Sequence, residues 1–368
     1  MVRTSGPVQW AAQGGARDWT SRSQRGAAYG FHASMPGYAA TRLVELSELA
    51  LELDVGAVFV KEESDRFGLP AFKILGASWA VNQALSAHAG FEAPAADLAE
   101  LRQRAAGTPV TLVTATDGNH GRGLARMAAI LGLPARVYLP AGTPSAVVAA
   151  ITGEWAEVIE TDLIYDDVVR VAADSTTGRP DDLLIQDTAW PGYEEVPAWI
   201  VQGYHTLFEE IARQLGGRRP DLVAVPTGVG SLLQAALEHY RAPSLPHRPA
   251  VLAVEPVSAA CVTASLAVGE RVSVDTSIPT IMAGLNCGSV STIAWPAIRH
   301  GLDAGIGVTD DQARDAVERL RELVVNAGPC GAASLAGVRI ALADADRRVA
   351  LGVTGDSVVV LLSTEARP

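Results

Sequence analysis

The chain has 368 residues, of which 48% are hydrophobic and 19% are charged. This length and composition suffice for a large buried core and for two domains. The formal net charge of −12 offers no basic surface for nucleic acid or for an anionic membrane, so we expect small-molecule partners, with no nucleic acid and no membrane.

The three cysteines, Cys261, Cys287 and Cys330, are odd in number and far apart in the sequence. They make neither a disulfide framework nor a paired metal-ligand spacing, and the histidines show no zinc-ligand pattern, so we predict no metal. No apolar run reaches the roughly 18 residues of a membrane span. Residues 1–25 are polar and lack the apolar segment of a secretory signal. We therefore expect a cytoplasmic protein with free thiols, in which residues 1–25 form a partly ordered extension.

Hydrophobic periodicity and turn residues predict strands and helices that alternate along the chain. Such alternation predicts an α/β fold with two open parallel sheets covered by helices on both faces. The predicted strands are 57–60, 110–115, 135–139, 157–159, 183–185, 221–225, 250–254 and 358–362, and the predicted helices are 41–53, 73–87, 93–106, 124–131, 145–151, 165–173, 197–215, 232–239, 309–325 and 332–342, with a loop at 328–331.

One lysine, Lys73, follows a predicted buried strand and begins the helix predicted over 73–87. The positive end of the helix dipole and the apolar neighbours Phe72 and Ile74 both favour the neutral amine, which predicts a lowered pKa. A neutral amine is the nucleophile that Schiff-base chemistry needs. The alternative is a surface lysine whose side chain extends from a helix end to water.

A glycine-rich turn, Gly228-Val229-Gly230-Ser231, lies between a predicted strand and a predicted helix. Glycines let the backbone approach an anion, and the N–H groups at a helix N-terminus favour phosphate. The turn lacks the features of nucleotide-binding glycine motifs, so a nucleotide is not the expected phosphate donor. The alternative is an ordinary tight turn.

Polar side chains follow other predicted strands. Asp117, Asn119 and His120 follow one strand, Asp187 follows another, and Ser363 ends the last strand. Asp117 is a candidate acid or base, whereas helix caps and turns are the alternative for each of these residues. His120 alone is more often a packed histidine than a catalyst. Ligands of such folds bind beyond the carboxyl ends of the strands, so we expect these residues to form one site.

Together, these motifs resemble those of one enzyme family. The chain is similar from about residue 29 to residue 365 to the tryptophan-synthase-β (threonine-deaminase-like) family of pyridoxal-phosphate enzymes, which have fold type II. Within that family it resembles the diaminopropionate ammonia-lyases most closely. The segments that carry the resemblance are 63–73, which ends in Ala-Phe-Lys, 115–123, which contains Asp-Gly-Asn-His-Gly, 186–193 and 283–288.

The resemblance implies a large cofactor-binding domain, 1–106 and 198–368, and a small inserted domain, 107–197. It implies pyridoxal 5′-phosphate as cofactor and a homodimer as the assembly. Lys73 would bind the cofactor covalently, and the amides of Gly228, Val229, Gly230 and Ser231 would bind its phosphate. Asn119 would contact the ring oxygen, and Ser363 would face the ring nitrogen.

The reaction implied by the resemblance is the α,β-elimination of 2,3-diaminopropionate to pyruvate and ammonia, a carbon–nitrogen lyase reaction of amino acid metabolism. Lys73 and Asp117 would serve as the acid and base, while Asp187 would recognise or activate the second amine. Two carboxylates suit a substrate with two ammonium groups, because each can pair with one cation.

The chain departs from the family pattern at 40–43, at 329–331 and at Ala366. These departures leave two alternatives open. One is a serine/threonine dehydratase or a β-replacement enzyme of a specialised amino acid pathway. The other is an inactive scaffold that binds pyridoxal phosphate.

Overall fold

The computed structural model describes residues 9–23 and 26–367. Contacts within the chain divide it into two compact units, which we call the first unit and the second unit. The first unit comprises Met1–Arg25, Ala40–Asp65 and Leu207–Pro368, and the second comprises Gly26–Ala39 and Arg66–Thr206.

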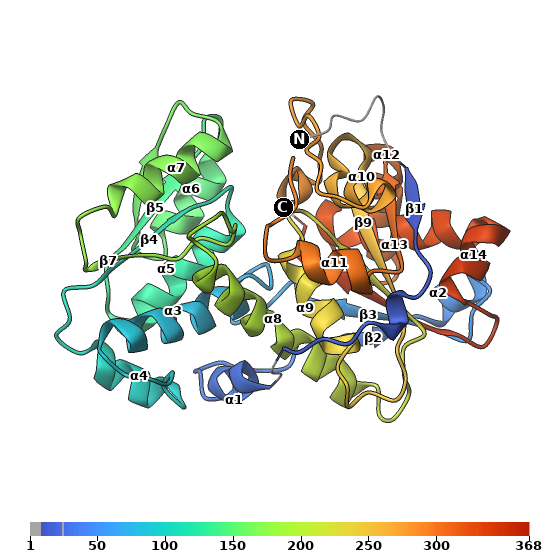
Figure 1. The fold of residues 1–368 in the computed structure, drawn as a ribbon, viewed down its shortest axis with the longest axis horizontal. Helices are drawn as coiled ribbons and strands as arrows, with labels where there is room; N and C mark the ends of the chain where they lie inside the picture. Colours follow the sequence, from blue (N-terminus) through green and yellow to red (C-terminus); the bar gives the residue numbers. More distant parts are fainter. Residues whose placement is uncertain (1–8, 24–25, 368) are drawn as a thin grey trace. The chain divides into compact units, whose positions relative to one another are not determined.

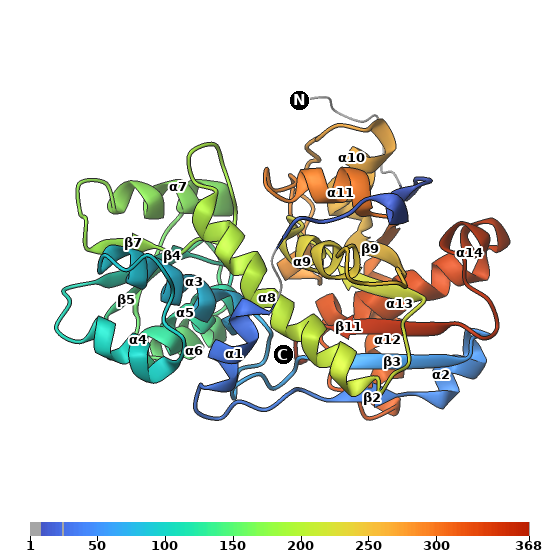
Figure 2. The same ribbon diagram turned by 60° about the horizontal axis from the view of Figure 1, so that its bottom comes forward.

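The first unit is built on a seven-stranded sheet in the order β1-β10-β9-β8-β11-β3-β2. Figure 2 shows β11, β3 and β2 of this sheet side by side. The inner strands run parallel, whereas the two edge strands are antiparallel to their neighbours. The strands are β1 (Trp10–Ala12), β2 (Leu43–Glu45), β3 (Ala57–Glu62), β8 (Leu222–Pro226), β9 (Ala250–Pro256), β10 (Ala304–Val308) and β11 (Val358–Ser363).

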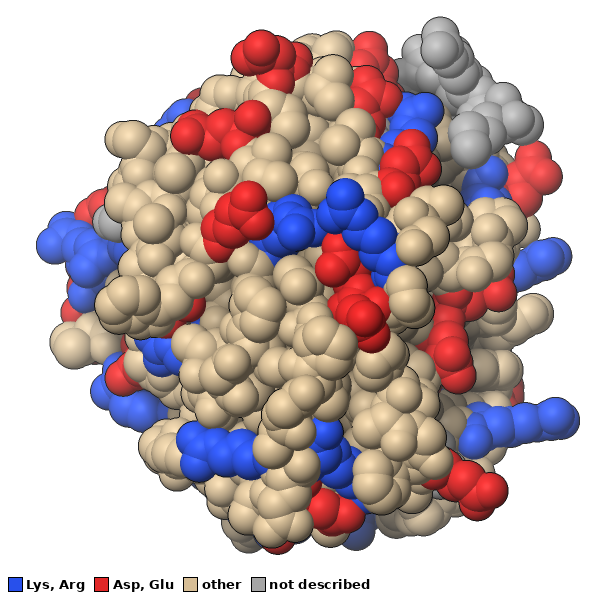
Figure 3. Space-filling view, turned by 90° about the vertical axis from the view of Figure 1, so that its left-hand side faces the viewer, with Lys and Arg blue, Asp and Glu red and all other residues tan. Residues whose placement is uncertain are grey.

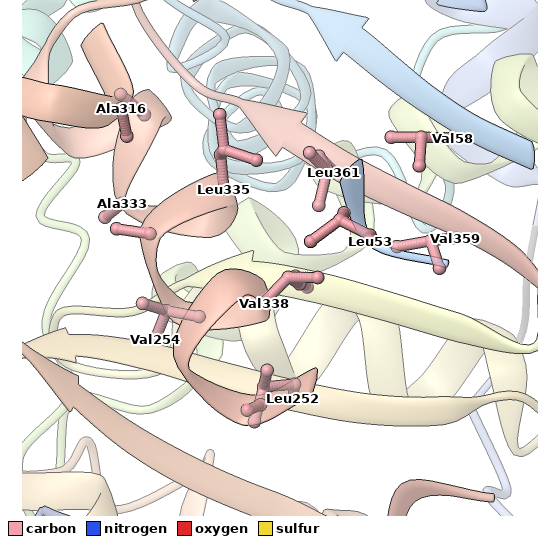
Figure 4. Close-up of a cluster of buried hydrophobic side chains, with 14 of the residues drawn as sticks. Leu53, Val58, Leu252, Val254, Ala316, Ala333, Leu335, Val338, Val359 and Leu361 are labelled. Atoms are coloured by element: carbon pink, nitrogen blue, oxygen red, sulfur yellow. The ribbon is translucent and has the colours of Figure 1, made fainter. Parts of the chain in front are cut away.

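Apolar side chains from the helices cover this sheet. Leu335 and Val338 of α13 lie beside Leu252 of β9 and Leu361 of β11 in one buried cluster (Figure 4). Inner strands buried on both faces explain why their sequences are almost continuously apolar. The helices of this unit are α2 (Ser47–Glu52), α9 (Ser231–Tyr240), α10 (Cys261–Val268), α11 (Trp295–Gly301), α12 (Asp310–Glu322), α13 (Pro329–Ala343) and α14 (Ala345–Leu351).

The second unit contains a four-stranded, wholly parallel sheet in the order β6-β5-β4-β7. Its strands are β4 (Thr111–Ala115), β5 (Ala135–Leu139), β6 (Glu157–Glu160) and β7 (Asp182–Leu184). The helices around it, labelled in Figure 1, are α1 (Ala27–Ala33), α3 (Ile74–His88), α4 (Leu98–Ala105), α5 (Asn119–Leu131), α6 (Ser145–Thr152) and α7 (Tyr165–Ser175). The helix α8 (Glu195–Gln214) is continuous, and the division between the units falls within it, after Thr206.

The predicted α/β fold with parallel sheets is confirmed, with a correction at the edges of the larger sheet. The helix predicted over 41–53 is wrong in its first part, because Leu43–Glu45 is the strand β2 and pairs with β3. A strand of three residues is too short to show an alternating pattern of apolar and polar residues. Part of the N-terminal extension is the edge strand β1, while residues 1–8 and 24–25 lie outside the described residues.

Two helices begin earlier than the sequence pattern predicted. The helix α5 begins at Asn119, and α13 begins at Pro329 inside the segment predicted as a loop. Proline fits the first position of a helix, where its missing N–H leaves no hydrogen bond unmade. Motif glycines, which lower helix propensity, therefore lie inside both helices.

The two compact units begin and end at other residues than the predicted domains, 1–106 with 198–368 and 107–197, whose boundaries stay a prediction. The helix α3 with Lys73 groups with 107–197 in the second unit, whereas the prediction assigns it to the larger domain. The reason is the close packing of α3 on α5. A Cβ added to Gly123 of α5 would lie 3.0 Å from the backbone nitrogen of Ile74, so only glycine allows this approach.

Among the described residues, no helix is both long enough and apolar enough to cross a bilayer. On the face drawn in Figure 3, acidic and basic side chains are interspersed. No field of a single sign covers that face.

Candidate active site

In the second unit, Lys73 and Asp187 form an ion pair. Lys73 is the N-cap residue of α3, and its Nζ donates a hydrogen bond to Asp187 Oδ2 at 2.8 Å. The lysine side chain is 29% exposed and the aspartate side chain 12% exposed, so the pair is largely removed from water.

This ion pair reverses the predicted protonation of Lys73. Burial alone would lower the pKa of Lys73, but the Asp187 carboxylate, together with Tyr204 and Asp117, raises that pKa well above its ordinary value. Burial likewise opposes ionisation of Asp187, yet Lys73 lowers the Asp187 pKa to about 2. The prediction of a lowered lysine pKa is therefore wrong for the protein without cofactor. That prediction used only the helix end and the residues adjacent to Lys73. It did not include the carboxylate of Asp187, which lies 114 positions away in the sequence.

The loop from β4 to α5 presents Asp117. The hydroxyl of Thr116 accepts hydrogen bonds from the N–H groups of Gly118 and Gly121, so this threonine caps the turn and the Asp117 carboxylate does not. Asp117 is accessible to solvent. Partial desolvation raises its pKa above the usual value, Lys73 opposes that change, and the charge of Asp187 reinforces it. Asn119 follows as the first residue of α5.

A hydrogen-bonded support behind Asp187 fixes its orientation. Gln186 is fully buried, and its Oε1 accepts from Thr114 Oγ1 and from the N–H of Ala115, both at 3.0 Å. Its Nε2 donates to Asp187 Oδ1 at 3.3 Å. The Tyr193 hydroxyl accepts from the N–H of Gln186 at 2.9 Å. Both carboxylate oxygens of Asp187 thus have assigned donors, Gln186 for Oδ1 and Lys73 for Oδ2.

Sequence reasoning missed Tyr204 as a neighbour of the lysine. Its ring packs on Phe72, with centroids 4.8 Å apart, and the residue is fully buried. Burial raises the pKa of its hydroxyl to about 12, against the attraction of the nearby Lys73 charge. No motif in the sequence marks Tyr204, because it lies in the middle of α8 among other buried residues.

In the first unit, the predicted phosphate loop connects β8 to α9. Gly230 is the N-cap of α9, has a φ of 100°, and supplies no side-chain cap for the first N–H groups of the helix. A Cβ on Gly230 would lie 2.9 Å from Ile298 Cδ1, and a Cβ on Gly228 would lie 2.9 Å from Cys287 Sγ. Glycine is therefore favoured at both positions, and Gly230 brings no side chain to the helix N-terminus, where backbone N–H groups can bind an anion.

Ser363 ends β11, the strand next to β8. The two strands are parallel, so their carboxyl ends, with Ser363 and the phosphate loop, share one edge of the sheet. Ser363 is fully buried, and its Oγ has no hydrogen-bond partner among the described residues. A buried hydroxyl without a partner costs free energy unless a ligand satisfies it.

A family model described as pyridoxal-phosphate dependent enzyme matches residues 35–365. The chain belongs to this family. The family predicted from the motifs is thereby confirmed.

Relatives and solved structures agree with this membership. A Salmonella typhimurium protein named diaminopropionate ammonia-lyase is 40% identical over 295 residues, which are 76% of this chain and 71% of the relative. An Escherichia coli protein of the same name is 35% identical over 355 residues, covering 94% of this chain and 89% of the relative. The crystal structure of diaminopropionate ammonia-lyase from Escherichia coli in complex with an aminoacrylate-PLP azomethine reaction intermediate is similar, with a TM-score of 0.87 and 32% identity over 98% of this chain and 95% of that one.

The residues present in this pyridoxal-phosphate dependent enzyme fit the cofactor. The unpartnered Ser363 hydroxyl can donate to a ring nitrogen, and the glycine loop at α9 can bind a phosphate. Lys73 supplies the amine that the aldehyde needs. The structure brings Lys73 and Asp187 into contact, with Asp117 in electrostatic range. Gly228–Ser231 and Ser363 belong to the first unit, whereas Lys73, Asp117 and Asp187 belong to the second unit.

Proposed function

We propose that this chain is a pyridoxal-phosphate-dependent ammonia-lyase that converts 2,3-diaminopropionate to pyruvate and ammonia by α,β-elimination. The observation that carries the proposal is the presence of two carboxylates, Asp117 and Asp187, in electrostatic range of Lys73. Proteins named diaminopropionate ammonia-lyase, 35–40% identical to this chain, support the same substrate.

Lys73, Asn119, the phosphate loop and Ser363 are the residues proposed to hold pyridoxal phosphate. Lys73 would bind its aldehyde carbon, and the amides of Gly228, Val229, Gly230 and Ser231 would bind its phosphate. Asn119 would contact the ring oxygen. The hydroxyl of Ser363 is a neutral donor and would face the ring nitrogen without adding a charge.

The bound cofactor supplies a ring that accepts the electron pair left on the α-carbon when its proton is removed. The two carboxylates are suited to different tasks because their pKa values are moved in opposite directions. Asp117, whose pKa is raised mainly by desolvation, exchanges protons more readily near neutral pH and is the proposed acid or base, together with Lys73. Asp187, whose pKa is lowered to about 2 against the effect of burial because Lys73 stabilises the anion, is the proposed partner of the second ammonium group of the substrate.

The Lys73–Asp187 ion pair also suggests how the diamine is selected. Asp187 Oδ2 lies 2.8 Å from the Lys73 ammonium nitrogen, so this buried carboxylate is placed to pair with a cation. An ammonium group on the β-carbon of the substrate replaces that cation. Serine and threonine carry a hydroxyl at this position and leave the buried carboxylate without a counter-ion, which is unfavourable.

The test is an absorbance spectrum with added pyridoxal phosphate, followed by pyruvate release from 2,3-diaminopropionate, serine and threonine. We expect a bound-cofactor band that Lys73→Ala abolishes, and a higher kcat/KM for the diamine. Asp187→Asn is the matched control, because it should keep the band and lose the preference for the diamine. A bound-cofactor band with faster turnover of serine or threonine would establish the dehydratase alternative instead. A band without turnover of any amino acid would favour the inactive scaffold that binds pyridoxal phosphate.

We further propose that the protein acts in the cytoplasm as a homodimer. The family resemblance supports the dimer, and the free thiols Cys261, Cys287 and Cys330 support a reducing compartment. Sedimentation equilibrium of the full chain with cofactor tests the dimer, since a mass equal to that of one chain at micromolar concentration would refute it.

A further inference from the structure

The hydroxyl of Tyr204 is a buried polar group that the proposed function does not use. Tyr204 lies in α8 and is fully buried, and its Oη has no hydrogen-bond partner among the described residues. A hydroxyl can donate one hydrogen bond and accept others, so burying it without a partner costs free energy. A buried hydroxyl of this kind calls for a reason in its surroundings.

Two glycines give the Tyr204 ring its place against α3. A Cβ added to Gly76 of α3 would lie 2.6 Å from Cε1 and 2.9 Å from Cζ of Tyr204. A Cβ added to Gly203 of α8 would lie 2.3 Å from the carbonyl oxygen of Leu75. Glycine is unfavourable inside a helix, yet at these positions it allows the two helices to touch. Because Cζ carries the hydroxyl, the polar end of the ring lies beside α3.

The same packing brings the hydroxyl close to the amine of Lys73. Gly76 is three residues after Lys73, so the two positions share a face of α3. The ring of Phe72 contacts both groups, with its centroid 5.7 Å from Lys73 Nζ and 4.8 Å from the centroid of the Tyr204 ring. Lys73 and Tyr204 interact electrostatically. An ammonium group has three N–H donors, and Asp187 accepts from one of them.

The Tyr204 hydroxyl is suited to be a second acceptor for this ammonium group. Burial raises the pKa of Tyr204 to about 12, so the hydroxyl is neutral near pH 7. A hydrogen bond from a cation to a neutral oxygen is stronger than one between two neutral groups. The Asp187 carboxylate is charged and is the stronger partner in the protein without cofactor. Tyr204 therefore matters most when another cation occupies Asp187.

We propose that Tyr204 is a positioning residue that accepts a hydrogen bond from the Lys73 ammonium while the second ammonium group of the substrate occupies Asp187. When Lys73 takes the α-proton of the substrate, a C–H bond breaks and an N–H bond forms on Nζ. The electron pair of the C–H bond stays with the α-carbon, from which the cofactor ring accepts it. Nζ is then cationic and needs a partner other than Asp187. This inference rests on the proposed function and adds a residue to it.

Other charged groups around this pair are common to all the variants compared below. Asp117, from the loop between β4 and α5, also raises the pKa of Lys73. His120 of α5 lies 4.0 Å from Asp187 Oδ2. The first turn of α3 contains no acidic residue. The difference between two variants that both retain Asp117 and His120 therefore reports on the substituted residue.

The test is nuclear magnetic resonance of the cofactor-free full chain with labelled lysine. The sequence contains two lysines, Lys61 and Lys73, so each amine can be titrated separately. Asp187→Asn removes the carboxylate, and burial should then bring the pKa of Lys73 down into a measurable range. Addition of Tyr204→Phe should lower this pKa by about one further unit, a tenfold change in the deprotonation equilibrium, because the ammonium loses its remaining acceptor.

Tyr240→Phe in the same Asp187→Asn background is the matched control. Tyr240 is a buried tyrosine of α9 whose hydroxyl also has no hydrogen-bond partner among the described residues, and its charged neighbour is Glu209. We expect this substitution to leave the pKa of Lys73 unchanged. The other lysine, Lys61, serves as the internal reference, because its Nζ is paired with Glu210 at 2.6 Å.

Two results of the titration would overturn the proposal. One is an unchanged Lys73 pKa when Tyr204→Phe is added to Asp187→Asn. The other is an equal fall with Tyr240→Phe, which would show a general effect of losing a buried hydroxyl. Because the titration uses neither cofactor nor substrate, its result is independent of the proposed function.

Kinetics of the loaded enzyme decide the question if Asp187→Asn does not fold. For 2,3-diaminopropionate, Tyr204→Phe should lower kcat about tenfold with little change in KM, because the lysine ammonium has no acceptor while Asp187 is occupied. For serine, which leaves Asp187 available to Lys73, kcat should change little. Equal losses of kcat for the two substrates would show that Tyr204 only packs the site. A wild-type enzyme without turnover of the diamine would overturn the proposed function as well, so the two failures are distinct.

Discussion

The Lys73–Asp187 ion pair should stabilise the cofactor-free fold, and its size follows from the pKa of the carboxylate. Burial opposes ionisation of Asp187, but the charge of Lys73 lowers its pKa from 3.8 to about 2. A pKa change of one unit corresponds to about 1.4 kcal/mol, so the change from 3.8 to about 2 corresponds to about 2.5 kcal/mol. Because the pair is largely removed from water, this exceeds the value of up to about 1 kcal/mol for exposed pairs.

The pH window follows from the direction of both shifts. A carboxylate with a lowered pKa stabilises the fold above its ordinary value of 3.8, and that stabilisation is lost as the pH falls toward 2. Burial opposes the charge of Lys73, but Asp187 raises the lysine pKa above its ordinary value of 10.5. An amine with a raised pKa stabilises the fold below its ordinary value and loses the effect as the pH rises beyond it. The pair should therefore contribute fully between about pH 4 and pH 10.

The assay is a double-mutant cycle of urea unfolding on the cofactor-free chain. It uses Lys73→Met, Asp187→Asn and the double variant. The cycle removes the separate effects of each substitution and leaves the interaction between the two side chains. We expect a coupling free energy of about 2.5 kcal/mol at pH 7 that decreases as the pH falls below 4. A coupling below about 0.5 kcal/mol at pH 7 would place the pair among exposed ones and refute the reasoning.

Three further substitutions test the rest of the site. Asp117→Asn should lower kcat by about 10²–10⁴ while the absorbance band of bound cofactor is kept, and unchanged kcat would exclude Asp117 as acid or base. Gly230→Ala should lower the free energy of unfolding by about 1–3 kcal/mol, because φ is 100° and the added carbon meets Ile298. Dialysis of the same variant should show faster loss of cofactor. Retention of the cofactor as in the wild type would argue against a role of this loop in phosphate binding. Ser363→Ala should change the unfolding free energy of the cofactor-free chain by less than about 0.5 kcal/mol, because the Ser363 hydroxyl has no hydrogen-bond partner among the described residues. The same substitution should weaken cofactor binding. A large loss of stability would show that the hydroxyl has a hydrogen-bond partner in the protein.

The sequence by itself determined the elements whose signals are local. Lys73 after a buried strand, the glycine loop before α9 and the serine at the end of β11 were all recognised from short segments. These features depend on strand–turn–helix geometry within a few residues, and the order of the motifs predicted the family. The alternation of strands and helices likewise predicted the α/β fold, because parallel strands require helical crossovers.

The tertiary structure alone decided the charge of the lysine and the roles of its neighbours. The carboxylate that raises the pKa of Lys73 against the effect of burial comes from 114 positions away, and Tyr204 comes from α8. The edge strand β1 also depends on a partner far along the chain, the strand β10. An electrostatic shift depends on distance in space and on burial, and neither is encoded in the spacing of residues along one segment. For that reason the sequence singled out Lys73 as the candidate lysine, whereas its protonation followed only from the folded chain.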